Sequence, residues 1–337
     1  DGKVDLSKSD RYISEEEAYG KYRHFLCDDG DFVIASSGIK VEYIDKKMGF
    51  VDASMLPLCM NTSTIRFKVL DENQLRIRYF MYYLKSKHFK EQLTKQITGS
   101  AQLNYGPSHL KKMIMPLIDI TVQDEIISCM DKLQSIIETR QRELIELDRL
   151  MKARFVELFG DPRSNPFGFE KKRLKDTCKV ITGNTPSRAI AEYYGDYIEW
   201  IKTDNIVSGI LNPTQATESL SEKGMNVGRT VEKDSILMAC IAGSIASIGR
   251  VCITDRTVAF NQQINAVVPE QYNILFLYVL FQMSKDYLVE DINMALKGIL
   301  SKSKLEEKEF IIPPMDLQEQ FSDFVKQVNK SKFDTMT

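Results

Sequence analysis

Hydrophobic positions predict a long amphipathic helix in the middle of the chain. Between Val122 and Phe159 there is no Pro or Gly, and apolar residues recur in steps of three and four. Such steps over several heptads are typical of a coiled-coil seam. Gly160 followed by Pro162 predicts the end of the helix. The predicted seam, which Arg140 interrupts, consists of Ile126, Met130, Leu133, Ile137, Leu144, Leu147 and Met151.

A second, shorter helix of the same character is predicted from Asp316 to the last residues of the chain. Its apolar stripe includes Phe321 and Phe324. An amphipathic helix this long needs a partner for its stripe, because its own hydrogen bonds do not bury the apolar face. The two helices could pack antiparallel against each other, or the long helix could pack on its own domain.

The remaining segments predict a mixture of strands and helices, and hence an α+β fold. Short runs rich in β-branched and apolar residues, bounded by turn residues, predict strands. Longer apolar runs predict buried helices. The predicted strands are 31–35, 177–182, 234–240 and 250–254, and the predicted helices are 77–84 and 274–283.

The chain contains an internal repeat. Ser108-His-Leu110 followed by Gln123-Asp-Glu125 reappears 195 residues later as Ser303-Lys-Leu305 followed by Gln318-Glu-Gln320. Each copy is a globular domain followed by a helix, and if the two long helices pack antiparallel, the duplicated domains make a pseudo-twofold arrangement. Nothing before Asp1 matches 161–204, so we expect the first copy to lack about 40 residues. The predicted parts are a first domain (1–120), a central helix (121–159), a second domain (160–314) and the start of a distal helix (315–337).

Composition excludes several classes of protein and leaves others open. The 337 residues are 43% hydrophobic, which argues against disorder, and no apolar run approaches the length of a membrane span. The six Cys residues form no C-x-x-C pair, the three His residues have no metal-ligand spacing, and no phosphate-binding loop is found. These observations predict reduced cytoplasmic thiols and argue against a His-based metal site and a phosphate-binding loop. The net charge of −2 does not decide whether it binds DNA.

Several motifs resemble those of the specificity subunits of type I restriction–modification enzymes. They are Leu158-Phe-Gly-Asp161, Gly183-Asn-Thr-Pro-Ser187, Tyr193-Tyr-Gly195, Trp200-Ile-Lys-Thr-Asp204 and Ile312-Pro-Pro-Met-Asp-Leu-Gln318. The chain departs from the pattern in two places: its first domain has no G-x-T-P segment, and its distal helix is short.

The resemblance implies two target-recognition domains, each of which reads one half of a split sequence in double-stranded DNA. The long helices would set the spacing and dock two modification subunits. It also implies that this chain is not catalytic. Methylation and cleavage would belong to modification and restriction/translocase subunits that use S-adenosylmethionine, ATP and Mg. The alternative is a coiled-coil scaffold with two protein-binding domains and no DNA contact.

Candidate DNA-contacting residues are polar or basic and lie near predicted turns. Bases are read by Arg, Lys, Asn and Gln, whereas small hydroxyl groups and basic side chains bind phosphates. Lys171, Lys172, Arg173 and Lys175 form a basic cluster that either meets phosphates or is only a solvated face. In the second domain the candidates are Asn184, Thr185, Ser187, Arg188, Lys202 and Thr203, and in the first they are Ser36, Ser37, Lys40, Gln102, Asn104 and His109.

Overall fold

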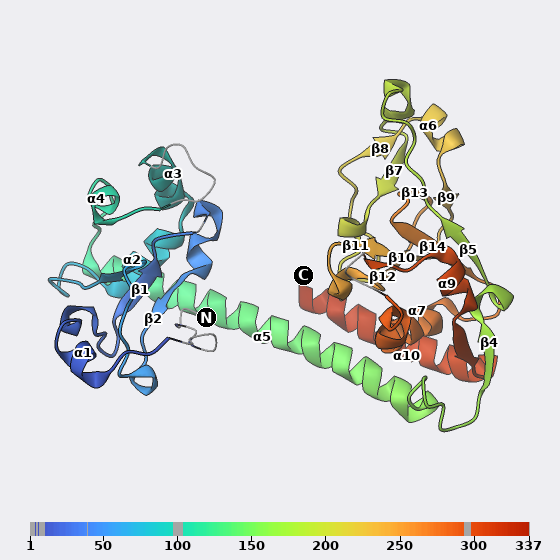
Figure 1. The fold of residues 1–337 in the computed structure, drawn as a ribbon, viewed down its shortest axis with the longest axis horizontal. Helices are drawn as coiled ribbons and strands as arrows, with labels where there is room; N and C mark the ends of the chain where they lie inside the picture. The colour runs from blue at the N-terminus through green and yellow to red at the C-terminus, as the bar shows by residue number, and fades with distance from the viewer. Residues whose placement is uncertain are drawn as a thin grey trace. The chain divides into compact units, whose positions relative to one another are not determined.

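The computed structural model describes residues 4, 6, 11–38, 40–96, 104–292 and 298–336. They form two compact units, Asp1–Ile137 and Glu138–Thr337, which Figure 1 shows in blue to green and in green to red. Each unit has a hydrophobic core of its own. The predicted parts, which set 121–159 apart as a separate spacer, remain a prediction.

The first unit is built on a three-stranded antiparallel sheet in the order β2-β1-β3. The central strand is β1, because Phe32, Val33 and Ile34 are all buried. The strands are β1 (Phe32–Ala35), β2 (Met48–Phe50) and β3 (Thr64–Phe67). The helices are α1 (Glu15–Tyr19), α2 (Ile77–Lys85), α3 (Lys87–Gln96), α4 (Pro107–Leu110) and the first part of α5 (Ile120–Phe159), with short 3-10 turns at Arg23–Phe25, Val41–Lys46 and Ala53–Met55.

The second unit contains two larger sheets and two short ribbons. One sheet is antiparallel in the order β12-β10-β14-β5, and the other has the order β6-β8-β7-β13-β9, with β7 and β13 parallel. Strands β4 and β16 form one ribbon, and β11 and β15 the other. The strands are β4 (Glu170–Arg173), β5 (Cys178–Thr182), β6 (Tyr194–Gly195), β7 (Ile198–Ile201), β8 (Ser219–Leu220), β9 (Thr230–Val231), β10 (Ile236–Ala239), β11 (Ile241–Ala242), β12 (Val251–Ile253), β13 (Val258–Phe260), β14 (Ile264–Pro269), β15 (Gly298–Ile299) and β16 (Glu309–Ile312).

Three helices form the base of the second unit's core. Phe155 of α5 lies between Phe276 of α7 and Phe321 of α10, with ring centroids 5.7 and 5.5 Å away. All three rings are fully buried, so they stabilise the unit by removing apolar surface from water. The helices are α6 (Glu222–Val227), α7 (Ile274–Met283), α8 (Lys285–Val289), α9 (Lys302–Glu307) and α10 (Met315–Met336), and 3-10 turns lie at Leu174–Asp176, Ala191–Tyr193, Thr203–Asn205 and Ile245–Ser247.

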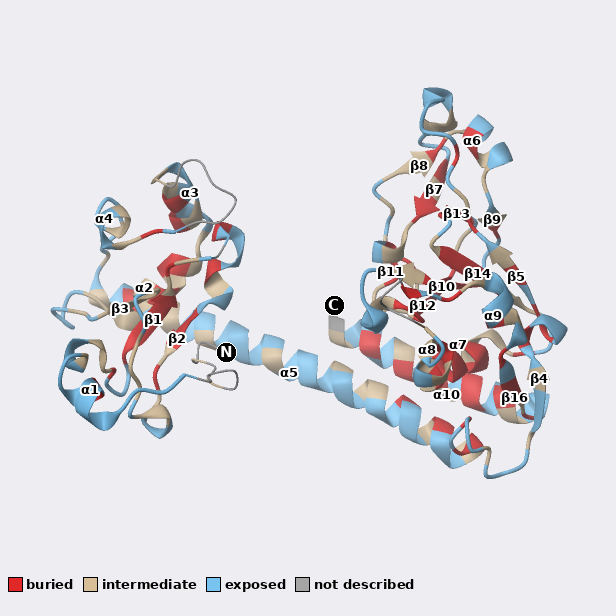
Figure 2. Cartoon of the chain, viewed as in Figure 1, coloured by how far each residue is buried: buried red, intermediate tan, exposed pale blue. Residues whose placement is uncertain are grey.

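Helix α5 is continuous over 40 residues, about 60 Å at 1.5 Å per residue. One face of its last turns is buried, and Met151, Phe155 and Phe159 on that face belong to the second unit's core. The middle of the helix is mostly exposed, as the pale blue segment in Figure 2 shows. The predicted helix from Val122 to Phe159 is confirmed, and it begins two residues earlier.

The internal repeat is confirmed, and equivalent backbone hydrogen bonds are present in both copies. The amide N–H of Tyr105 donates to the carbonyl oxygen of Ser36 at 3.0 Å, and that of Leu300 donates to Cys240 at 2.9 Å. The two oxygens follow β1 and β10, the central strands of equivalent sheets. Helices α2, α4 and α5 of the first unit therefore correspond to α7, α9 and α10 of the second.

A buried glutamine occupies the same place in both copies. The side-chain oxygen of Gln123 accepts from the amide N–H of Arg76, and that of Gln318 accepts from Asn273, both at 2.9 Å. Their amide nitrogens donate to the carbonyl oxygens of Ile118 and Pro313. In each unit, therefore, one side chain links the start of the long helix to the start of the core helix.

Most predicted elements of the globular parts are also confirmed. Strands β1, β5, β10 and β12 and helices α2 and α7 lie within one or two residues of the predicted ranges. The distal helix begins at Met315, one residue before the predicted start.

Candidate nucleic-acid interface

The G-x-T-P segment after β5 is fixed by the start of β14 and the end of β13. Its first residue, Gly183, donates to the carbonyl oxygen of Ile264 at 3.0 Å. A Cβ atom at this position would overlap the carbonyl oxygens of Phe260 and Asn261. Only glycine allows so close a backbone approach, so the loop leaves the sheet at a defined point.

Trp200 of β7 holds this loop through a hydrogen bond from its indole ring. Its indole N–H donates to the carbonyl oxygen of Asn184 at 3.3 Å, and its ring is 3% exposed. The Asn184 side-chain amide donates to the carbonyl oxygen of Val227, while its side-chain oxygen is buried and has no hydrogen-bond partner within the described part of the chain. The prediction that Trp200 packs in the core with a polar partner for its N–H is confirmed.

Arg188 and Lys202 converge on one carboxylate above the indole ring. The guanidinium carbon of Arg188 lies 4.4 Å from the ring centroid of Tyr194 and 5.2 Å from that of Trp200. Its Nη2 donates to Glu218 Oε2 at 2.6 Å, and Lys202 Nζ donates to the other carboxylate oxygen. Lys202 also lies 5.2 Å from the Trp200 ring. We call these five side chains the Arg188 cluster.

The Arg188 cluster carries one excess positive charge. Hydrogen bonds from Lys202 and then from Arg188 hold the pKa of Glu218 below its ordinary value, so the carboxylate is ionised at neutral pH. The Arg188 side chain is 56% exposed, whereas that of Lys202 is 26% exposed. A cation that is exposed yet oriented by aromatic rings and a carboxylate is suited to contact a ligand with hydrogen-bond acceptors.

The other candidates of the second domain lie around the same loop. Thr185 is exposed and its hydroxyl donates to the side chain of Gln262. Ser187 is exposed, and Thr203 is half-buried at the start of a 3-10 turn. The described structure thus brings Arg188 and Lys202 together, while Asn184 and Thr185 hold the loop in place.

The candidates of the first domain have mainly internal partners. Ser36 is buried, and the side chain of Asn104 accepts from the N–H of Gly38 at 3.3 Å. His109 Nδ1 accepts from the N–H of Gly106 at 3.1 Å, which caps α4. Ser37 is half-buried and Lys40 is exposed. Gln102 lies outside the described residues.

Two residues of the Arg188 cluster were missed by sequence reasoning. Tyr194 belongs to a motif that was noted, but nothing in the sequence pointed to a stack with an arginine. Glu218 is 30 residues from Arg188, and the pairing of β8 with β7 brings it beside Trp200, over which Arg188 lies. Such a strand pairing has no local signal in the sequence.

The basic cluster near the entrance of the second domain is largely neutralised by acids. Arg173 pairs with Asp176 at 3.0 Å, and Lys175 pairs with Glu307. Lys172 lies 3.6 Å from Glu170. This geometry favours a solvated face.

The predicted seam residues divide into two groups. Met130, Leu133 and Ile137 are 38–51% exposed in the first unit, and Ile126 is half-buried. In the second unit Leu144 and Leu147 are half-buried, Met151 and Phe321 are buried, and Phe324 packs at the edge of the core. Among the described residues, the seam is thus exposed from Met130 to Ile137 and becomes buried toward the end of α5.

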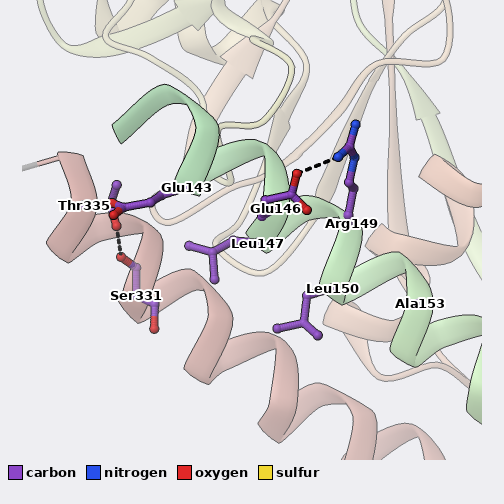
Figure 3. Close-up of a pocket in the computed structure, with 8 residues that line it drawn as sticks. All are labelled: Glu143, Glu146, Leu147, Arg149, Leu150, Ala153, Ser331 and Thr335. Atoms are coloured by element: carbon purple, nitrogen blue, oxygen red, sulfur yellow. Dashed lines mark hydrogen bonds and ion pairs between the residues drawn. The ribbon is translucent and has the colours of Figure 1, made fainter. Parts of the chain in front are cut away.

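An open apolar groove of about 660 Å³ lies between α5 and α10. Leu147 and Leu150 point into it, and an ion pair between Arg149 and Glu146 lies at its rim (Figure 3). Ser331 and Thr335 of α10 form the opposite wall and are hydrogen-bonded to each other.

Two further searches cover the described part of the chain. No helix there is both long and apolar enough to cross a membrane. Over the same residues, no three His, Cys, Asp or Glu side chains are grouped so that they could hold a metal ion.

Comparisons with known proteins point to one family. The model of a family described as "type I restriction modification DNA specificity domain" matches residues 3–149 and again 166–337. The HindI specificity subunit of Haemophilus influenzae is 33% identical over 146 residues, which are 42% of this chain and 31% of that protein. The alignment thus spans about a third of that relative's length.

Two further relatives match over more of the chain. The MjaIX specificity subunit of Methanocaldococcus jannaschii is 24% identical over 302 residues, which are 83% of this chain and 68% of that protein. The crystal structure of a type I restriction–modification S subunit from M. genitalium has a TM-score of 0.56 at 14% identity and covers 93% of this chain and 79% of that one. At this identity the structural likeness shows the fold.

Proposed function

The chain belongs to the family of type I restriction–modification DNA specificity domains, and we propose that it is the DNA-recognition subunit of such a complex. The observation that carries the proposal is the double match, because the family model covers each of the two repeated parts of the chain. Each unit would read one half of a bipartite target in double-stranded DNA.

The proposal includes partners and excludes catalysis by this chain. Two modification subunits would dock on helices α5 and α10, since a repeated structure offers equivalent surfaces to two copies of one partner. Restriction/translocase subunits would complete the complex in the cytoplasm. Methyl transfer from S-adenosylmethionine and ATP- and Mg-dependent cleavage would take place on those partners.

The test is selection from a library of random DNA duplexes by the full chain co-purified with its modification subunits. A DNA-recognition subunit should enrich a motif of two fixed parts separated by a spacer, and it should bind this motif at least about 1,000-fold more tightly than random duplex. Affinity should fall as the salt concentration rises, because phosphate contacts release counterions. A scaffold that does not contact DNA would enrich no motif, and this result would end the proposal.

A further inference from the structure

We infer that Arg188 reads a guanine of the target and that Glu218 is the positioning residue that holds its guanidinium for this contact. The inference rests on the proposed function, since it names the base that one surface of the second unit would recognise. It concerns a single base pair in one half of the target.

The Arg188 guanidinium is oriented by two kinds of contact. The ring of Tyr194, 4.4 Å away, and the ring of Trp200, 5.2 Å away, limit its tilt. The Glu218 carboxylate holds one terminal nitrogen at 2.6 Å. An arginine side chain fixed in this way loses little conformational freedom on binding, so more of the interaction energy is available for discrimination.

The supports of the cluster are themselves held in place. The Tyr194 hydroxyl donates to the carbonyl oxygen of Pro186 at 2.6 Å, within the G-x-T-P loop. The amide N–H of Trp200 donates to the carbonyl oxygen of Glu218 at 3.1 Å, which connects β7 to the residue before β8. Hydrogen bonds therefore link the residues of the loop, the two rings and the carboxylate to one another around the guanidinium.

The guanidinium retains donors for a ligand. Its side chain is 56% exposed, and among the described residues Glu218 is the only hydrogen-bond partner found for it. The Nε N–H, both Nη1 N–H groups and the second Nη2 N–H are therefore available, so Nη2 together with Nη1 or with Nε still offers two parallel donors. Two parallel donors of an arginine match the O6 and N7 acceptors of guanine in the major groove.

The carboxylate decides between a base and a phosphate as the ligand. An ionised Glu218 within hydrogen-bond distance of Arg188 repels a phosphate anion that approaches the same nitrogen atoms, and it repels a neutral guanine edge, whose O6 and N7 carry only partial negative charge, much less. A phosphate can also be bound by an unoriented point charge such as that of a lysine, whereas the two acceptors of a guanine edge require oriented donors. The geometry is therefore better suited to reading a base.

The experiment repeats the duplex selection with Arg188→Lys and Glu218→Gln in the same complex. Arg188→Lys keeps the charge but loses the fork, so we expect the preference for one G·C pair to fall about 10- to 100-fold while the other positions and the salt dependence stay unchanged. Glu218→Gln should weaken the same position, by about fivefold or more, and should raise the affinity for random duplex.

Glu192→Gln is the matched control. Glu192 pairs with Lys223 on the surface of the same unit, and both side chains are about 70% exposed. This variant should leave every position of the motif unchanged. Circular dichroism melting of each variant checks that the second unit is folded.

The possible failures are distinct. A uniform loss of affinity with Arg188→Lys would assign Arg188 to a phosphate and overturn the inference. A motif that neither Arg188→Lys nor Glu218→Gln changes would overturn it as well, while the proposed function stands. If the wild-type complex enriches no motif, the proposed function fails and the inference fails with it.

Discussion

The two units share the same hydrogen-bonding framework, yet helix α5 is joined to each of them differently. In the first unit the junction is polar, since Arg76 pairs with Asp124 at 2.8 Å and Arg78 pairs with Asp131 at 2.6 Å. In the second unit the junction is apolar, because Phe155 and Phe159 of α5 are fully buried against α7 and α10.

The shared glutamines and the aromatic contacts of the second unit have different physical roles. The buried glutamines, which are present in both copies, set how the long helix meets the core helix. Burial of aromatic rings, which α5 provides only in the second unit, adds stability because each ring removes a large apolar area from water. We therefore expect the second unit to be the more stable of the two and the first to unfold at lower denaturant concentration.

The largest effect is expected for Phe155→Ala. Removing a fully buried ring should lower the free energy of unfolding of the second unit by about 3–5 kcal/mol, through lost burial and the cavity left behind. Urea unfolding followed by fluorescence measures this directly, because Trp200 is the only tryptophan and lies in the second unit. The control is Val156→Ala on the exposed side of α5, which should change little. Equal losses for both variants would contradict the proposed role of the apolar junction.

A smaller effect, equal in both units, is expected from the glutamines. Gln123→Ala and Gln318→Ala each remove the acceptor of a helix-starting N–H group, which should cost about 1–3 kcal/mol. Trp200 fluorescence reports on the second unit. Alkylation of the buried Cys27, followed by mass spectrometry, reports on the first.

Gln320→Ala is the matched control for the glutamines, since Gln320 is exposed on the same helix as Gln318. A large loss from Gln318→Ala alone would show that the two copies use the shared framework differently. A loss from Gln320→Ala as large as that from Gln318→Ala would assign the effect to the helix and not to the buried amide.

The smallest effect concerns pH and only the second unit. A hydrogen bond from Arg256 lowers the pKa of Glu199 in the folded state. The stability from this pair is therefore present above the unfolded pKa of the glutamate, about 4.3, and is lost as pH falls through the lower folded pKa. Because both side chains are partly exposed, we expect a loss of less than about 1 kcal/mol.

Urea unfolding at pH 6 and at lower pH, followed by Trp200 fluorescence, measures this loss. Glu199→Gln should flatten the decrease, and Arg256→Gln should do the same because it removes the cause of the pKa shift. An unchanged pH profile in both variants would mean that other carboxylates carry the acid sensitivity of the unit.

How far the sequence predicts the structure depends on the range of each interaction. Helices α5 and α7 follow from local periodicity and from the absence of helix-breaking residues. Strands of two residues, such as β6, β8 and β9, carry no such pattern and form only because neighbouring strands offer hydrogen-bonding edges. Motif reasoning identified Arg188 and Lys202 as candidates for the site, but it could not identify Glu218, which lies just before β8 and is distant from both in the sequence.

The candidate residues of the first unit show a second limit of prediction from sequence. His109 and Asn104 were selected because their side chains can read bases, yet each of them accepts a hydrogen bond from a nearby backbone N–H. Side-chain type alone does not distinguish a residue that binds a ligand from one that satisfies the backbone. Here the surrounding hydrogen bonds make that distinction.

The close approach of Gly183 to β13 determines where new DNA preferences could be engineered. The backbone at this position has no room for a side chain, so a mutant library should leave it unchanged. Variation should instead be placed at Ser187, Arg188, Lys202 and Glu218, whose side chains lie around the loop and are at least partly exposed. Gly183 thus marks the part of the loop that must stay fixed, and the side chains around it are the positions at which DNA preference could be changed.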